Sequence, residues 1–192
     1  MDSNRFDMDN RIHSLAKNKK VVELCCGRGD IIQKLKSEVK EIIGIELSEE
    51  RIALCKEKFR KDKKVKIMSE NISKIPLKSG EYDLVIIKMG LHHVKDINSV
   101  LYESSRILKT GGKFIIVDKF LTGNLLLSNL YDLYLFLKTG RKDFFQHHYR
   151  TEEEVKKVAE KYFRIRKRII LPYQKGIKNK LYLKYLYILE KR

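Results

Sequence analysis

The sequence has few cysteines, and their positions exclude several classes of protein. Cys25, Cys26 and Cys55 are an odd number of cysteines without the spacing of a metal site. A disulfide between the adjacent Cys25 and Cys26 would strain the backbone. We therefore expect neither a disulfide framework nor a bound metal, and a reducing cytoplasmic location fits best.

Long apolar segments and linkers are also missing. The longest apolar run, 125–137, is interrupted by Ser128, Asn129 and Asp132, so no membrane-spanning helix is predicted. Residues 1–20 do not resemble a signal peptide. Since there is no Pro-rich or Ser-rich linker and no internal repeat, we expect one domain over residues 1–192.

Basic residues, in contrast, are abundant, and the net charge is +17. Clustered Lys and Arg would indicate a partner such as nucleic acid or an anionic membrane surface. Here they are spread along the chain, with the densest stretches at Lys56–Lys66, Arg164–Arg168 and Lys175–Lys184. Solvated faces are the favoured interpretation, and nucleic-acid binding or peripheral membrane contact is the alternative. Nothing in the sequence indicates an oligomeric state.

Apolar runs and helical patterns alternate through the first two thirds of the chain. Strands are predicted at Val21–Cys25, Glu41–Ile45, Val65–Met68, Tyr82–Lys88 and Lys113–Asp118. Helices are predicted at Asp30–Ser37, at Ser48–Arg60 with Ser48 as N-cap, and at about Asp96–Leu108 with its end at Gly111 and Gly112. This alternation is typical of an α/β fold with a doubly wound, mostly parallel sheet.

The pattern changes after Asp118. Leu121–Lys138 is apolar on most sides and is predicted to be an inserted helix, either core, a cover or a surface for a lipid-like molecule. Thr151 caps a helix that continues to Tyr162. Arg164–Leu171 and Leu181–Leu189 then read as a C-terminal antiparallel hairpin.

The segment VVELCCGRGD joins an apolar strand to a helix through a turn that contains Gly27 and Gly29. Glycines allow a ligand to approach the backbone closely. The carboxylates of Glu23 and Asp30 make the site unsuited to a pyrophosphate and better suited to a cationic ligand. Glu46, which ends the second strand, is placed to accept hydrogen bonds from both hydroxyls of a ribose.

These segments resemble the motifs of class I S-adenosylmethionine-dependent methyltransferases. VVELCCGRGD is similar to their first motif, an acidic residue followed by G-x-G-x-G, and GIELSEE to their second. Glu23, Gly27, Gly29 and Glu46 match, whereas Cys25 stands where the family most often has its first glycine. The resemblance implies a seven-stranded Rossmann-like sheet and S-adenosylmethionine as cofactor.

Later segments extend the resemblance to about residues 20–118. Ser69–Val94 is similar to the third and fourth motifs, with Asn71 in place of an acidic residue that reads the adenine, and Ile107–Asp118 is similar to the LKPGG turn and fifth strand. An amide can also pair with adenine; an ordinary Asx turn is the alternative for Asn71. The cofactor-binding residues that this reading implies are Glu23, Cys25, Gly27, Gly29, Glu46, Leu47, Asn71, Ile72 and Lys88.

Within this reading, residues 1–118 form the cofactor-binding half, 119–150 a helical cover over the acceptor, and 151–192 the last helix and hairpin. His92 and His93 follow the fourth strand and are candidates for acid–base catalysis, with a structural role as the alternative. His147, His148 and Tyr149 are candidates for contact with the methyl acceptor, with ordinary surface residues as the alternative.

The sequence thus predicts a methyltransferase that acts on a small molecule. The chain reads KMGL after the fourth strand, where base-modifying enzymes of the family carry an NPPY-type motif, so methylation of nucleic-acid bases is disfavoured. The alternatives are an RNA-directed enzyme, a lipid or quinone methyltransferase, and a catalytically silent partner subunit that keeps the cofactor site.

Overall fold

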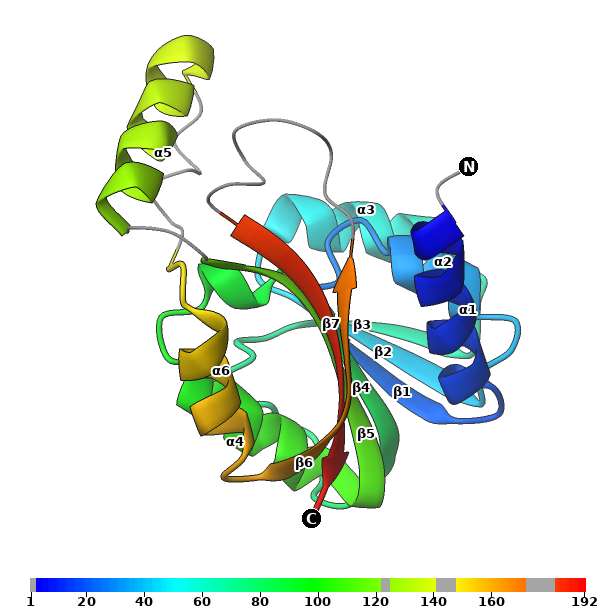
Figure 1. The fold of residues 1–192 in the computed structure, drawn as a ribbon. Coiled ribbons are helices and arrows are strands. Elements are labelled where there is room, and N and C mark those ends of the chain that lie inside the picture. Colours follow the sequence, from blue (N-terminus) through cyan, green and yellow to red (C-terminus); the bar gives the residue numbers. More distant parts are fainter. Residues whose placement is uncertain (1–2, 122–124, 141–147, 172–181) are drawn as a thin grey trace.

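The computed structural model describes residues 3–121, 125–140, 148–171 and 182–192, and within them a central sheet of seven strands (Figure 1). The strands are β1 (Lys20–Leu24), β2 (Glu41–Glu46), β3 (Val65–Ser69), β4 (Tyr82–Lys88), β5 (Leu108–Leu121), β6 (Phe163–Leu171) and β7 (Tyr182–Lys191). They lie in the order β3-β2-β1-β4-β5-β7-β6. β1 to β5 are parallel, and β7 is antiparallel to β5 and β6. The predicted doubly wound sheet with a terminal hairpin is confirmed.

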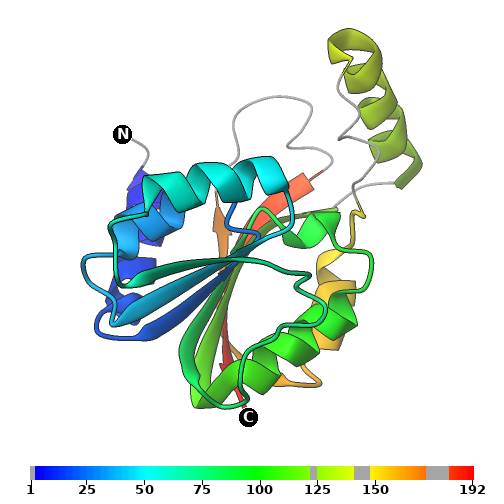
Figure 2. The same ribbon diagram turned by 180° about the vertical axis from the view of Figure 1, so that it is seen from behind.

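Helices cover both faces of the sheet, as the two opposite views show (Figures 1 and 2). They are α1 (Ser3–Ala16), α2 (Asp30–Leu35), α3 (Glu49–Lys58), the 3-10 turn η1 (Leu91–His93), α4 (Ile97–Ile107), α5 (Leu125–Thr139) and α6 (Glu152–Ala159). Side chains of α1, α2 and α3 pack in one apolar core and those of α4 and α6 in another, with the sheet between them. Both cores are built from the buried Val, Ile and Leu side chains of the parallel strands, as expected for a sheet covered on both faces.

The helix starts follow the expected capping chemistry. The Ser48 side chain accepts from the backbone N–H of Arg51 at the start of α3. Thr151 and Glu154 form a reciprocal capping box at the start of α6. These two predicted starts are confirmed.

The predicted bounds of α4, about Asp96–Leu108, agree with the observed Ile97–Ile107, but the prediction that the glycine pair ends the helix is wrong. The last helical residue is Ile107, and Leu108 is already extended, with ψ 144°. The strand β5 therefore begins before Gly111 and Gly112. Its pairing with β4 shifts in register there, since Tyr82 pairs with Leu108 and Leu84 with Lys113.

The order of the strands reverses between β1 and β4. From β1 the chain proceeds outward to β2 and β3, and it then returns to β4 and β5 on the other side of β1. Open α/β sheets bind their ligands outside the carboxyl ends of the strands at such a switch point. A ligand site is therefore expected at this edge, which is formed by the turn after β1, the end of β2, the segment after β4 and the end of β5.

The inserted helix α5 lies where the sequence predicted one, between β5 and α6. In both views it extends beyond the carboxyl edge of the sheet, away from the two helical layers (Figures 1 and 2). Its role as a cover over the acceptor stays a prediction.

Candidate functional site

The turn between β1 and α2 consists largely of left-handed backbone. Gly27 has φ 57° and Gly29 has φ 72°, values that side chains rarely adopt. A Cβ at Gly29 would lie 2.5 Å from the ring of Phe59 in the segment after α3, so glycine is also required by space. A Cβ at Gly27 would meet nothing within 4 Å. The turn therefore has open space beside Gly27.

Cys25 occupies the position of the missing glycine and keeps the glycine conformation, with φ 54°. The room for its side chain comes from Gly90, where a Cβ would lie only 2.7 Å from Cβ and 2.9 Å from Sγ of Cys25. Burial, with Glu46 and Asp118 nearby, raises the pKa of the Cys25 thiol to about 12. The thiol is therefore protonated at neutral pH and fills space without acting as a nucleophile.

Glu46 connects the end of β2 to the glycine turn. Its side chain is 7% exposed, and Oε2 accepts a hydrogen bond from the backbone N–H of Gly27 at 2.9 Å. Oε1 accepts from the N–H groups of Leu47 and Ser48 at 2.9 and 3.0 Å. The structure therefore brings Glu46 and the turn together and fixes the carboxylate in one orientation. Leu47, next in the chain, is 68% exposed.

Glu23, on β1, has a carboxylate oxygen without a partner. The residue is 4% exposed, and Oε2 has no hydrogen-bond partner among the described residues. Burial raises the pKa of Glu23 to about 8, an effect that a backbone N–H of Ile32 and the charge of Lys88 only partly offset. A buried acceptor of this kind suits a cationic ligand group, because such a group would supply the missing partner.

Asn71 and Ile72 follow β3 at the same edge of the sheet. The Asn71 side chain is exposed, and its Oδ1 accepts from the N–H of Ser73 at 2.9 Å. Asn71 thus forms the Asx turn that the sequence allowed as an alternative. The turn uses only the side-chain oxygen, and the amide nitrogen of Asn71 takes no part in it. Ile72 is buried, and Lys88, at the end of β4, is half-buried.

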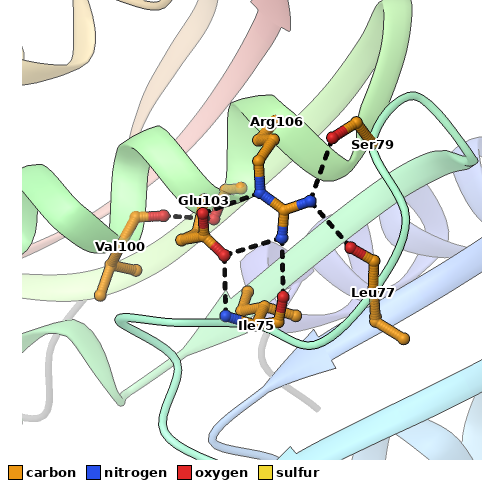
Figure 3. A network of polar contacts seen from close by, with 7 residues as sticks. Ile75, Leu77, Ser79, Val100, Glu103 and Arg106 are labelled. Carbon is orange, nitrogen blue, oxygen red and sulfur yellow. Dashed lines mark hydrogen bonds and ion pairs between the residues drawn. The ribbon is translucent and has the colours of Figure 1, made fainter.

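A cluster of polar contacts holds the loop that follows Asn71 (Figure 3). Arg106 donates from Nη1 to the carbonyl of Leu77 and to Ser79, and from Nη2 to the carbonyl of Ile75. Glu103 binds Arg106 through both carboxylate oxygens and accepts from the N–H of Ile75 at 2.7 Å. These bonds lower the pKa of Glu103. The sequence analysis did not identify this pair; its signal was an acidic and a basic residue three positions apart on one helix.

His92 is buried against a carboxylate at the end of β5. Its Nδ1 lies 2.5 Å from Oδ1 of Asp118, and the two side chains are 5% and 1% exposed. Asp118 also accepts from the backbone N–H groups of Leu91, His92 and Lys119. The contact orients the His92 ring, because the carboxylate itself is fixed by three backbone donors. In the sequence, Asp118 is recognisable only as the end of a predicted strand.

His93 differs from its neighbour although the two rings lie 4.2 Å apart, centre to centre. The His93 side chain is exposed, whereas His92 is buried. The two histidines, which the sequence does not distinguish, therefore differ in the structure: His92 is buried and bound to Asp118, whereas the His93 side chain is exposed.

The segment before α6 packs against the His92 region. The N–H of His148 donates to the carbonyl of His92 at 2.7 Å, and the Tyr149 ring is parallel to the His92 ring at 6.1 Å. Arg150 fixes the segment by donating to the carbonyls of His148 and Lys95. His148 and Tyr149 therefore lie beside His92, while His147 lies outside the described residues.

A small pocket lies at this place. Its lining includes Leu91 and His92 after β4, Lys119 and Phe120 on β5, and Arg150 before α6. Apolar side chains, a ring nitrogen donor or acceptor and two cations therefore meet at one depression, at the same edge of the sheet as the glycine turn.

Comparison with known proteins relates the chain to methyltransferases. A family profile described as a methyltransferase domain matches residues 22–116. The demethylmenaquinone methyltransferase of Lactococcus lactis is 31% identical over 103 residues, which are 51% of this chain and 41% of the relative. The enzyme of the same name from Staphylococcus aureus is 31% identical over 105 residues, which are 53% of this chain and 44% of the relative. The matches thus span less than half the length of these relatives.

Solved structures show the same fold at low identity. Geranyl diphosphate C-methyltransferase from Streptomyces coelicolor, in complex with S-adenosyl-L-homocysteine, superimposes with a TM-score of 0.81 at 15% identity and covers 99% of this chain and 76% of that one. The [4+2]-cyclase SpnF superimposes with a TM-score of 0.77 at 13% identity and covers 98% and 81%. Because a cyclase shares this fold, the fold alone does not determine the reaction.

Proposed function

Since the chain belongs to the class I S-adenosylmethionine-dependent methyltransferases, we propose that it binds S-adenosylmethionine at the carboxyl ends of β1 and β2 and methylates a small molecule beside His92. The observation that carries this proposal is the pair of carboxylates around the glycine turn. Glu46 is fixed on the N–H of Gly27, and Glu23 has a buried oxygen without a partner. A ligand with hydroxyls at one end and an ammonium group at the other fits this arrangement.

Each cofactor contact has a candidate residue. Glu46 accepts from the ribose hydroxyls, and Glu23, with Cys25, Gly27 and Gly29, forms the site for the methionine end. Leu47 and Ile72 supply apolar surface for the adenine, and Asn71 pairs with its edge through the amide. Lys88, on β4, favours the ionised form of Glu23, because its positive charge opposes the effect of burial on the Glu23 pKa.

The bound cofactor supplies a methyl group that is already activated by its positive sulfur. The chain then has to align the acceptor, exclude water and remove a proton where the acceptor has one to lose. We assign the last task to His92, since Asp118 orients its ring through Nδ1. His93 is the second candidate; its exposed side chain makes it the weaker one.

The proposed acceptor is an apolar molecule with a ring hydroxyl, such as a quinol. Leu91 and Phe120 line the pocket, and Tyr149 presents an aromatic ring next to His92. His148 lies on the same side and completes the set of acceptor contacts. The names of the two curated relatives, which act on a demethylated menaquinone, support this acceptor class.

Cofactor binding is tested by calorimetry with S-adenosylmethionine, S-adenosylhomocysteine and NAD. We expect binding of the two sulfur compounds only, and Glu46→Ala should lose about 2 to 4 kcal/mol of their binding free energy. The matched control is Glu49→Ala, which removes an exposed carboxylate in the first turn of α3. Binding of NAD alone, or equal affinities of the two variants, would contradict the assignment.

The acceptor is tested with a reduced naphthoquinone that lacks its ring methyl group. Incubation with S-adenosylmethionine should add one methyl group, detected by mass spectrometry, and His92→Ala should reduce the rate about 100-fold or more at unchanged cofactor affinity. The control is His13→Ala, because His13 lies on α1. Methylation of RNA but not of the quinol would overturn this acceptor class and leave the cofactor assignment intact.

A further inference from the structure

The helix α5 carries an exposed apolar stripe. Its members are Leu126, Leu130, Leu133, Tyr134 and Leu137, which are 63%, 52%, 41%, 53% and 75% exposed. Their spacing of three and four residues places all five on one side of an α-helix. One side of the helix therefore presents a row of apolar side chains to its surroundings.

The position of α5 makes this stripe accessible. The helix extends beyond the carboxyl edge of the sheet and away from both helical layers (Figures 1 and 2). A contiguous stripe of exposed apolar side chains often marks an interaction surface, whereas single exposed apolar side chains do not. The stripe therefore indicates an interaction surface, which Leu130, Leu133 and Leu137 define.

The length of α5 limits the kind of contact. With 15 residues it is about 22 Å long at 1.5 Å per residue, shorter than the hydrocarbon core of a bilayer. Among the described helices, none has the length and apolar character needed to cross a membrane. A helix of this kind can bury one apolar face at the boundary between headgroups and acyl chains while it lies along the surface.

Charge distinguishes between a membrane and a second copy of the chain. The four leucines have the spacing of a short coiled-coil seam, which is typical of helix pairing. Self-association, however, would bring together two chains with a net charge of +17 each. An anionic lipid surface would attract the same charge, and Lys138, whose Nζ lies 5.9 Å from the centre of the Tyr134 ring, places a cation directly beside the stripe.

We propose that the α5 stripe docks the protein on an anionic membrane surface, with the leucines inserted among the acyl chains and Tyr134 and Lys138 at the headgroups. Aromatic rings and lysines are favoured at that depth because one end of each side chain is apolar and the other is polar. The docked helix would bring the His92 edge of the sheet to the membrane. The proposal does not depend on the identity of the methyl acceptor.

The test is flotation of the full chain with vesicles of phosphatidylcholine alone and of phosphatidylcholine mixed with phosphatidylglycerol. We expect binding to the mixed vesicles, at least about 10-fold weaker binding of the double variant Leu130→Gln/Leu133→Gln, and little binding to the neutral vesicles. The matched control is Leu54→Gln, which changes an exposed leucine of α3. Equal unfolding temperatures would show that the variants remain folded.

Three outcomes would overturn the proposal. Equal vesicle binding by the double variant and the unchanged chain would show attraction by charge alone. A dimer in light scattering that the double variant abolishes, without vesicle binding, would assign the stripe to a second copy. The absence of binding to either type of vesicle, with the chain monomeric, would show that the stripe is not a membrane surface.

Discussion

Two regions at the carboxyl edge of the sheet differ in which side chains they bury: one buries carboxylates, and the other exposes leucines. The buried carboxylates of Glu46 and Asp118 are each held by three backbone N–H groups. In α5, by contrast, Leu126, Leu130, Leu133 and Leu137 are exposed. The difference indicates that the first region is arranged in advance by the chain itself, whereas the second is completed by something outside it.

The largest expected effect on stability comes from removing one of the two carboxylates that backbone N–H groups hold. Asp118→Ala leaves the N–H groups of Leu91, His92 and Lys119 without their acceptor, and we expect a loss of about 3 to 5 kcal/mol in the free energy of unfolding. Denaturation in urea measures it. Asp96→Ala is the matched control, because it removes an exposed carboxylate that also caps backbone donors and should cost about 1 kcal/mol. A loss below that of the control would show that the His92 region is not held by Asp118.

The next effect concerns pH and Glu23. Because burial raises the Glu23 pKa from 4.5 to about 8, the folded chain holds this proton in a pH range where the unfolded chain has lost it. The contribution of Glu23 to stability is therefore complete below about pH 4.5 and is lost as the pH rises through 8, by an amount on the order of a few kcal/mol. Glu23→Gln cannot lose a proton.

The difference between the two proteins isolates this group. The free energy of unfolding of Glu23→Gln, relative to that of the unchanged chain, should increase steadily between pH 5 and pH 8. Urea denaturation at several pH values gives both curves. Parallel curves would mean that Glu23 is ionised in the folded protein, and they would remove the argument that its carboxylate awaits a cationic partner.

The smallest predicted effect concerns the loop behind the cofactor site. Arg106→Lys removes the forked contact with Glu103 and the bonds to the loop carbonyls, which a single ammonium group cannot replace. We expect a loss of about 1 to 2 kcal/mol in stability and a cofactor affinity a few-fold weaker. The matched control is Arg166→Lys. Arg166 forms an ion pair with Glu190, but its side chain is half exposed, so this variant should change neither the stability nor the cofactor affinity by a measurable amount. Identical behaviour of both variants would show that the loop does not need this clamp.

Sequence patterns predicted the part of the fold in which local and global signals agree. The apolar runs and glycine turns predicted the five parallel strands, and the resemblance to the family's motifs assigned Gly27 and Glu46 to one cofactor site, where the structure shows them in contact. The helix α1 was overlooked, although Met8, Ile12 and Ala16 recur every four residues and are buried. Its signal was present but short, in a segment rich in polar residues.

Other features could not be obtained from local patterns. No rule of spacing connects His92 to Asp118, because their contact depends on the neighbouring positions of β4 and β5 in the sheet. The apolar pattern of α5 is equally compatible with a buried helix, and only its place in space shows that the leucines are exposed. The end of α4 was misplaced because the glycines serve an irregular start of β5 rather than a helix cap.

The close approach of Cys25 and Gly90 has a consequence for the evolution of this chain. A Cβ at position 90 would lie 2.7 Å from Cβ of Cys25, and its next neighbour outside residue 25 is Cγ1 of Ile87 at 3.2 Å. The two positions are therefore coupled: Cys25→Gly removes the two shortest of these contacts, so alanine at 90 should cost less after Cys25→Gly than before it. The order in which the two substitutions can accumulate is thus influenced by a contact between the segments that follow β1 and β4.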